Sequence, residues 1–223
     1  MEVMPHSYTN HTTKDGPVVT KSYQGPDAPA RCAREAAVLS AVAGRLPVPP
    51  VISHSNTSLG LGFMPGVPGQ ELIDAALAEP VLRACGRMLR RIHAIDPEQA
   101  QAGDNDEGSL VLVHGDYGPQ NTLLDAAARE VTAVVDWEWA HAGDPLEDLA
   151  WCEWIIRMHH PDHVGALGSL FDGYSHRPAW VARQQAMLAQ CRNLLALCQR
   201  WQPGGTSVHL WSQRLQVTKS WTE

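Results

Sequence analysis

Three polar side chains follow an apolar run in LVLVHGDYGPQNTLLD, residues 110–125: His114, Asp116 and Asn121. A second apolar run lies in REVTAVVDWEWA, and Asp136 follows directly after its apolar residues VTAVV. Gly and Pro separate the first three, so we expect the chain to leave a strand there and enter a loop. A carboxylate can orient a hydroxyl or take its proton, and carboxylate and amide oxygens suit Mg²⁺. The set therefore fits phosphoryl transfer from a magnesium-bound nucleotide, with Asp116 at the hydroxyl and Asn121 and Asp136 on the metal.

A lysine and a glutamate upstream could complete a nucleotide site. Lys21 is one of three lysines in the chain and lies in the apolar, strand-like VVTKSY. A lysine there can place a compact charge on nucleotide phosphates, and a carboxylate from the next helix can hold it in position. Glu35, within CAREAAVL, fits that second role. The alternative for Lys21 is an ordinary solvent-facing strand residue.

The ordered set HGDYGPQNTLLD and VVDWEWAHAGDPLEDLAW resembles the central signature of the aminoglycoside phosphotransferase family, small-molecule kinases also called the phosphotransferase enzyme family. Compared with the protein-kinase pattern, Gly115 replaces an Arg and DWE replaces DFG. The resemblance implies a protein-kinase-like, two-lobed α+β fold, ATP (or GTP) and Mg²⁺ as cofactors, and a hydroxylated small molecule as acceptor. It also implies that His114 braces the catalytic loop and that Asp144 and Asp148 organise the following turn and helix.

The N-terminal segment departs from that family pattern. No GxGxxG precedes VVTKSY, PHSYTN stands in its place, and little chain is left for a first full strand, so we expect a shortened nucleotide lid. Ser7, Thr9 and Asn10 could offer hydroxyls and backbone N–H groups to a phosphate, or form a polar loop without that role. By the same resemblance, backbone groups around Phe63 and Met64 in GLGFMPG would meet the base, with a plain linker as the alternative.

The acceptor side is less well defined. In the family the acceptor binds between the catalytic loop and the helices of the second lobe. Glu138 could bind a cationic or hydroxylated acceptor, or make a structural hydrogen bond instead. An aminoglycoside and a metabolite are both compatible. Four tryptophans lie near the site in sequence, and we expect most to pack in the core and one to line the pocket: Trp137, Trp139, Trp151 and Trp154.

Two alternatives to a kinase use the same residues. A protein of the same fold could bind nucleotide without catalysis, as the missing Gly-rich loop suggests. A metal-dependent hydrolase could instead bind Zn²⁺ or Mn²⁺ through two histidines and two aspartates: His114, Asp116, Asp136 and His141. The hydrolase leaves the Lys21 and Glu35 pair and Asn121 without a role.

Apolar spacing locates the elements that must position these residues. Alternation predicts strands over residues 16–23, around Val51 and over 59–64, with one helix over 29–43. Apolar residues three and four apart predict three later helices, around residues 81–92, 146–158 and 179–201. We therefore expect two lobes: a β-rich nucleotide-binding lobe over residues 1–65 and a larger, mainly helical catalytic lobe over residues 66–223.

Composition excludes other classes of function. The formal net charge is −7 without a run of Lys or Arg, which argues against a nucleic-acid partner. No run approaches the ~20 apolar residues of a membrane span and MEVMPHSYTN has no signal-peptide core, so we expect a cytoplasmic protein. The five cysteines lack CxxC spacing and are expected to be free thiols. HHPDH, residues 159–163, could bind a metal, but a surface turn is favoured. The oligomeric state is not indicated.

Overall fold

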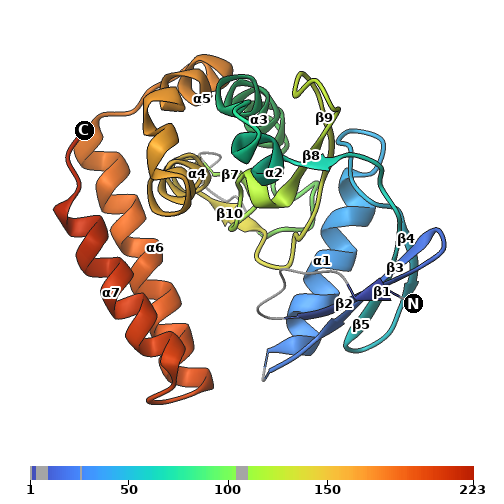
Figure 1. The fold of residues 1–223 in the computed structure, drawn as a ribbon. Coiled ribbons are helices and arrows are strands. Elements are labelled where there is room, and N and C mark those ends of the chain that lie inside the picture. The colour runs from blue at the N-terminus through green and yellow to red at the C-terminus, as the bar shows by residue number, and fades with distance from the viewer. Residues whose placement is uncertain (1, 4–9, 26, 104–109) are drawn as a thin grey trace.

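The structure is a computed structural model that describes residues 2–3, 10–25, 27–103 and 110–223. Figure 1 shows a sheet with one helix beside it at one end, a body of helices and short strands, and two long helices at the other end. The strands of the first sheet run in the order β1-β2-β3-β5-β4, with antiparallel neighbours. They are β1 (Glu2–Val3), β2 (Asn10–Asp15), β3 (Val18–Tyr23), β4 (Val51–His54) and β5 (Ser58–Gly62).

The central strand of this sheet is β3, which confirms the strand expected around VVTKSY. Lys21 pairs with Thr12 on one side and Leu59 on the other, and its side chain is buried. Strand β1 is described over two residues only, and residues 4–9 lie outside the described ranges, so the shortened nucleotide lid stays a prediction. The six-residue β2 was not expected, because NHTTKD has no apolar alternation. A strand inside a sheet can be polar when its neighbours supply the hydrogen bonds, so pairing decides this element.

One helix, α1 (Ala28–Val42), follows the β2–β3 hairpin and confirms the helix predicted over residues 29–43. A proline in its first turn suits a helix start, since that N–H has no partner inside the helix. Its buried face carries Cys32, Val38 and Leu39 into the main core. The same face carries two buried charged side chains, Arg31 and Glu35. Buried charges need partners. Lys21 of β3 pairs with Glu35, and Glu138 from the later part of the chain pairs with Arg31.

The chain leaves the first sheet after Gly62 and enters a second, three-stranded sheet of order β6-β8-β9. A further antiparallel pair, β7 and β10, lies beside it. The elements of this middle part are β6 (Val67–Pro68), α2 (Gly69–Asp74), α3 (Ala78–Ile92), β7 (Val111–Val113), the 3₁₀ turn η1 (Pro119–Asn121), β8 (Thr122–Leu124), β9 (Val131–Val134) and β10 (His141–Gly143). The predicted helix over 81–92 is thus confirmed as most of α3.

The last part of the chain is helical. It contains α4 (Leu146–His159), the 3₁₀ turn η2 (Pro161–Ala166), α5 (Leu167–Tyr174), α6 (Trp180–Trp201) and α7 (Thr206–Ser220). Helices α4 and α6 confirm the predictions over 146–158 and 179–201, whereas α7 was not predicted. Figure 1 shows α6 and α7 as a hairpin, with α6 on the side facing the rest of the molecule. A second apolar cluster, separate from the main core, joins α4 to this hairpin through Trp154, Met187 and Cys191.

Helices α3 and α5 approach each other at glycines. A Cβ atom on Gly86 would lie 2.1 Å from the carbonyl oxygen of Leu170, and one on Gly173 would lie 2.2 Å from that of Arg83. Backbone atoms at these distances cannot move aside as a flexible side chain can. The two glycines therefore allow the close packing of α3 on α5.

We expect Gly86→Ala to lower the free energy of unfolding by roughly 1–3 kcal/mol, because the methyl group would force α3 away from α5. Denaturant unfolding measures this. Gly168→Ala is the matched control, since nothing lies within 4 Å of its Cβ position near the start of α5. It should be neutral or slightly stabilising through helix propensity. Equal changes in the two variants would contradict the close-packing explanation.

None of the helices in the described ranges is long and apolar enough to span a bilayer. The cysteines are free, as expected, and four are buried. The HHPDH segment forms the end of α4 and the start of η2, where His160 Nδ1 lies 3.2 Å from Asp74 Oδ1. Among the described residues, the one His/Cys/Asp/Glu group spaced for a metal lies elsewhere and contains no histidine. The turn interpretation of HHPDH therefore fits the structure.

Candidate functional site

Asn121 and Asp136 are brought together by the pairing of β8 with β9. Thr122 pairs with Val134, and the Val135 N–H donates to the carbonyl oxygen of Asn121 over 3.0 Å. The end of β9 therefore lies beside the start of β8, which places both residues at one end of the hairpin. Asp136 has a φ of +69°. A left-handed backbone is uncommon outside glycine and is often found where a side chain must point in a functional direction.

The loop from His114 to Asp116 is braced from beneath by Asp148 on α4. Asp148 Oδ2 accepts the His114 N–H over 2.7 Å, and Oδ1 accepts the Gly115 N–H over 2.9 Å. His93 Nε2 lies 3.3 Å from the same carboxylate. Burial alone would raise the pKa of Asp148, but the hydrogen bond and charge of His93 and the hydrogen bond from the His114 N–H bring it below its usual value. A buried, ionised carboxylate thus fixes the backbone before Asp116.

His114 links the loop around Asp116 to the end of β9. Its Nδ1 accepts the Asp116 N–H over 3.3 Å, so Nε2 carries the proton and donates to the Val135 carbonyl over 3.0 Å. Burial lowers the pKa of His114, which keeps the ring neutral in this tautomer. Its ring packs against Trp137 at 4.6 Å between centroids. The imidazole therefore positions the loop through both of its nitrogens.

Gly115 is needed because the chain passes close to another backbone there. Its φ is +84°, and a Cβ atom would lie 2.5 Å from the carbonyl oxygen of Trp139. Both facts disfavour any other residue at this position. The departure from the protein-kinase pattern at Gly115 thus has a local steric cause.

Both carboxylate oxygens of Asp116 accept hydrogen bonds. Asn121 Nδ2 donates to Oδ2 over 2.9 Å, and Trp151 Nε1, from α4, donates to Oδ1 over 2.8 Å. Burial and the nearby charge of Asp136 raise the pKa of Asp116 to about 7, although the bonds from Trp151 and Asn121 lower it. A carboxylate with such a pKa can exchange a proton near neutrality.

Lys21 connects the first sheet to Asp136, which follows the β8–β9 hairpin. Its Nζ lies 2.5 Å from Glu35 Oε2 on α1 and 2.5 Å from Asp136 Oδ1. Burial would lower the pKa of Lys21, but the charges of Asp136 and Glu35 outweigh it and raise the pKa well above its usual range. Glu35 also accepts hydrogen bonds from the Tyr23 hydroxyl and the Trp137 N–H. The Lys21 ammonium is therefore protonated and held between Glu35 of α1 and Asp136, which follows β9.

Two roles were considered for Glu138, contact with the acceptor and a structural hydrogen bond, and the structure shows it hydrogen-bonded within the chain. Its side chain is 1% exposed and lies 2.6 Å from Arg31 Nη1, which is equally buried. Asn10 Nδ2 also donates to Glu138, over 3.1 Å. The carboxylate is thus enclosed by α1 and β2, and in this arrangement it faces a cation of its own chain. Asn10, proposed as a phosphate contact, is buried in the same network.

Of the remaining N-terminal candidates, Phe63 and Met64 lie apart from this network. Ser7 and Thr9 are outside the described residues. Phe63 is 41% exposed, its N–H donates to the Pro17 carbonyl over 2.8 Å, and Lys14 Nζ sits 3.7 Å from its ring centroid. Phe63 and Met64 follow β5 and precede β6, so they lie in the connection between the two sheets. The Phe63 N–H is therefore already hydrogen-bonded within the chain.

Asp144 lies at the start of α4. Its Oδ1 accepts the Leu146 N–H over 2.8 Å, and its own N–H donates to Glu147 Oε1 over 2.9 Å. This reciprocal arrangement satisfies backbone N–H groups that a helix start leaves without partners. Asp144 therefore fixes where α4 begins, and α4 in turn carries Asp148 and Trp151 to the catalytic loop.

The donor set fits a hard divalent cation. Both N–H groups of the Asn121 amide point to Asp116, which leaves the amide oxygen directed away from it. The Asp136 side chain is 30% exposed and uses one oxygen for Lys21. An amide oxygen and a carboxylate are ligands that Mg²⁺ accepts, so Asn121 and Asp136 would suit this ion. Glu35, Asp136 and Glu138 also lie within reach of one another, but Lys21 and Arg31 already pair with the two glutamates.

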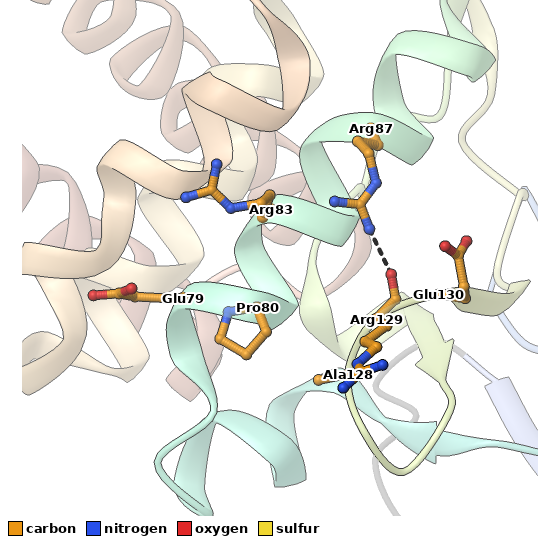
Figure 2. A pocket seen from close by; sticks show the side chains of 7 residues that line it. All are labelled: Glu79, Pro80, Arg83, Arg87, Ala128, Arg129 and Glu130. Carbon is orange, nitrogen blue, oxygen red and sulfur yellow. Dashed lines mark hydrogen bonds between the residues drawn. The ribbon is translucent and has the colours of Figure 1, made fainter.

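A hollow between α3 and the loop that joins β8 to β9 does not contribute to this site. Figure 2 shows it between the first turns of α3 and the loop joining β8 to β9, bordered by three arginines and two glutamates that do not converge on one point. Arg87 donates to the Arg129 carbonyl there, and Arg83 pairs with Asp172 outside the hollow. None of the residues that contact Asp116 lines it.

The comparisons with known proteins agree with this geometry. The model of the Phosphotransferase enzyme family matches residues 5–108 and 99–185, well over half of the chain. The chain belongs to the phosphotransferase enzyme family. Membership assigns phosphoryl transfer as its class of reaction, as expected from the motif HGDYGPQN.

Solved structures place the fold. A macrolide 2'-phosphotransferase from Brachybacterium faecium superposes with a TM-score of 0.68 and 19% identity over 100% of this chain and 93% of that one. The GDP complex of an aminoglycoside 2'-phosphotransferase has a TM-score of 0.78 and 12% identity, covering 98% of this chain and 92% of that one. A streptomycin and ATP complex of a related enzyme has a TM-score of 0.65 and 12% identity, with coverages of 94% and 90%. These likenesses confirm the predicted kinase-like α+β fold.

Two curated relatives are much longer proteins. Acyl-CoA dehydrogenase family member 10 of Mus musculus is 24% identical over 53% of this chain and 16% of that protein. Family member 11 of Gallus gallus is 33% identical over 30% of this chain and 9% of that protein. The chain thus spans less than a fifth of either relative, and their names describe those whole proteins.

Proposed function

We propose that the protein transfers the γ-phosphate of ATP, or of GTP, to a hydroxyl group of a small molecule. The observation that supports this most directly is the convergence of Asp116, Asn121, Asp136 and Lys21 from three separate segments at one end of the β8–β9 hairpin. A non-catalytic protein would not need a carboxylate with a raised pKa beside a metal-type ligand pair. The acceptor proposed is an antibiotic of the aminoglycoside or macrolide kind, or a metabolite.

Each residue has a defined role in this proposal. Asn121 and Asp136 would hold Mg²⁺, which would supply positive charge to neutralise the charge that develops on the transferred phosphoryl group. Lys21, held by Glu35, adds a second positive charge at the same place. Asp116 would accept a hydrogen bond from the acceptor hydroxyl and take its proton as the oxygen bonds to the γ-phosphorus. The bond from that phosphorus to the β,γ-bridging oxygen breaks, and ADP or GDP leaves. The hydroxyl must then displace the Trp151 or the Asn121 donor from one oxygen of Asp116, or share that oxygen with it.

The metal-dependent hydrolase is disfavoured by His114. Both of its ring nitrogens are occupied, by the Asp116 N–H and by the Val135 carbonyl. A metal ligand needs a free lone pair on nitrogen, so this histidine would have to rotate out of the core. His141 bonds instead to the Trp139 carbonyl and to Glu147.

The direct test is calorimetric titration of the protein with ATP, with and without Mg²⁺. We expect Mg²⁺ to strengthen binding of ATP, and Asp136→Ala to weaken binding of Mg-ATP at least about tenfold while changing metal-free ATP little. Asp172→Ala, on exposed α5, is the matched control. An equal loss of both forms of the nucleotide in Asp136→Ala would remove Asp136 from the metal site.

Trp151→Phe tests the hydrogen bond to Asp116. The variant keeps an aromatic ring but loses the N–H that favours the charged carboxylate, so the pKa of Asp116 should rise. A bond of this kind contributes roughly 1.5–3 kcal/mol, so the acid limb of kcat/KM against pH should shift upward by about one to two units. Trp154→Phe, on the same helix, is the control because its N–H donates to Thr218 instead. Unchanged pH profiles in both variants would contradict a role for Trp151 at Asp116.

A further inference from the structure

The end of α6 contacts the start of α1. Trp201, the last residue of α6, donates through Nε1 to Asp27 Oδ2 over 3.3 Å, and Arg200 Nη2 lies 3.1 Å from the same oxygen. A Cβ atom on Gly25 would lie 3.2 Å from the Trp201 ring, so the ring packs directly on the chain before α1. Figure 1 shows this end of the α6–α7 hairpin turned toward the start of α1. The hairpin therefore contacts the chain that leaves β3 and begins α1, in addition to α4.

The Trp201 ring also covers the buried guanidinium of Arg31. The guanidinium carbon lies 4.9 Å from the centroid of the Trp201 ring, and the ring centroids of Trp139 and Tyr23 lie at 5.5 and 5.8 Å. Arg31 Nε is buried and has no hydrogen-bond partner in the described part of the chain. The face of an aromatic ring attracts a guanidinium, and the attraction is stronger where water is excluded. Trp201 therefore helps to hold Arg31 in place and to keep water from it.

The position of Arg31 is linked to that of the lysine at the candidate site. Arg31 and Glu35 lie one turn apart on the buried face of α1. Arg31 Nη1 lies 2.6 Å from Glu138 Oε2, and Glu138 comes two residues after Asp136. Glu35 Oε2 lies 2.5 Å from Lys21 Nζ, which is also 2.5 Å from Asp136 Oδ1. A shift of the first turn of α1 would therefore move Glu35, and Lys21 with it, relative to Asp136.

We propose that Trp201 is a positioning residue for phosphoryl transfer, which holds the first turn of α1 and so keeps Glu35 and Lys21 at Asp136. This inference rests on the proposed function, because it assumes that Lys21 acts on the nucleotide phosphates. Contact with water weakens the attraction between two charges. Loss of the Trp201 ring would open the Arg31 ion pair to water on one side and would remove a contact at the start of α1. The affinity for Mg-ATP therefore depends on a residue of the last helical hairpin.

Calorimetric titration of the full chain with Mg-ATP tests this role. We expect Trp201→Ala to weaken binding at least about fivefold, and Trp201→Phe, which keeps a ring over Arg31, to stay within about twofold of the unchanged protein. Trp180→Ala is the matched control and should not weaken binding, since Trp180 begins α6 and covers Arg157 and Arg183 instead, at 4.6 and 5.3 Å. No weakening in Trp201→Ala, or weakening at least as large in Trp180→Ala or in Trp201→Phe, would overturn the proposal.

A double variant separates positioning from a general loss of structure. Glu35→Gln should weaken binding of Mg-ATP by itself, because Lys21 loses the charge that holds it. If Trp201 acts through Glu35, adding Trp201→Ala to Glu35→Gln should weaken binding by no more than about a further twofold. A merely structural role would make the two losses multiply, and that result would overturn the proposal. Failure of the proposed function is distinguishable, because the unchanged protein would then bind no Mg-nucleotide in the same calorimeter.

Discussion

Asp116→Asn should abolish phosphoryl transfer while leaving Mg-ATP binding nearly intact. The amide cannot take the proton of the acceptor hydroxyl, and removal of a general base typically lowers kcat by about 10²–10⁴-fold. Asn121 and Asp136 keep their oxygens for the metal, so binding of the nucleotide does not depend on the Asp116 charge. Turnover is measured as ADP release in the presence of acceptor, and nucleotide binding is measured by calorimetry.

The stability of this variant separates a catalytic from a structural role. The folded-state pKa of Asp116 is raised to about 7, above its ordinary value of 3.8. Between these values the folded protein binds the proton more tightly than the unfolded chain, so stability rises as pH falls through this range and is lower when the carboxylate is ionised. Removing the charge should therefore leave the melting temperature at neutral pH unchanged or higher. A variant that loses turnover, nucleotide binding and stability together would contradict the assignment.

The loop around Asp116 and the β8–β9 hairpin could be predicted from the sequence because their residues are close together in the chain. His114, Asp116 and Asn121 lie within eight residues, and one strand pair carries Asn121 to Asp136. Apolar runs broken by Gly and Pro are strong local signals. The Lys21 and Glu35 pair was within reach for a similar reason, since a strand and the next helix usually pack together.

Other parts of the site depend on contacts that sequence spacing does not encode. Trp151 reaches Asp116 only because Asp144 fixes the start of α4 and so sets which residues face the loop. Its position within a tryptophan-rich segment indicated core packing equally well. Arg31 lies four residues before Glu35 on the buried face of α1. That spacing of two charges on an apolar face was the available signal, but the partner, Glu138, lies over a hundred residues away.

Breaking the Arg31 and Glu138 pair should have the largest effect on stability. Both side chains are 1% exposed, so Arg31→Met would leave an unpaired buried carboxylate and should lower the free energy of unfolding by roughly 3–5 kcal/mol. Glu138→Gln should also destabilise, because it leaves the guanidinium buried with a weaker partner. The double variant Arg31→Met with Glu138→Gln should recover much of the loss, since neither charge remains. Denaturant unfolding of the three variants gives the coupling free energy between the two side chains.

Arg83→Met provides the matched control for this cycle. Arg83 pairs with Asp172, but the two side chains are 46% and 63% exposed, and such pairs contribute only about 0–1 kcal/mol. A loss in Arg31→Met no larger than in Arg83→Met would mean that water reaches Glu138. The carboxylate would then be available to an acceptor, and the first prediction made for Glu138 would regain support. A large loss with strong coupling instead keeps Glu138 as the residue that ties α1 to the segment following Asp136, and so holds Glu35 and Lys21 beside Asp136.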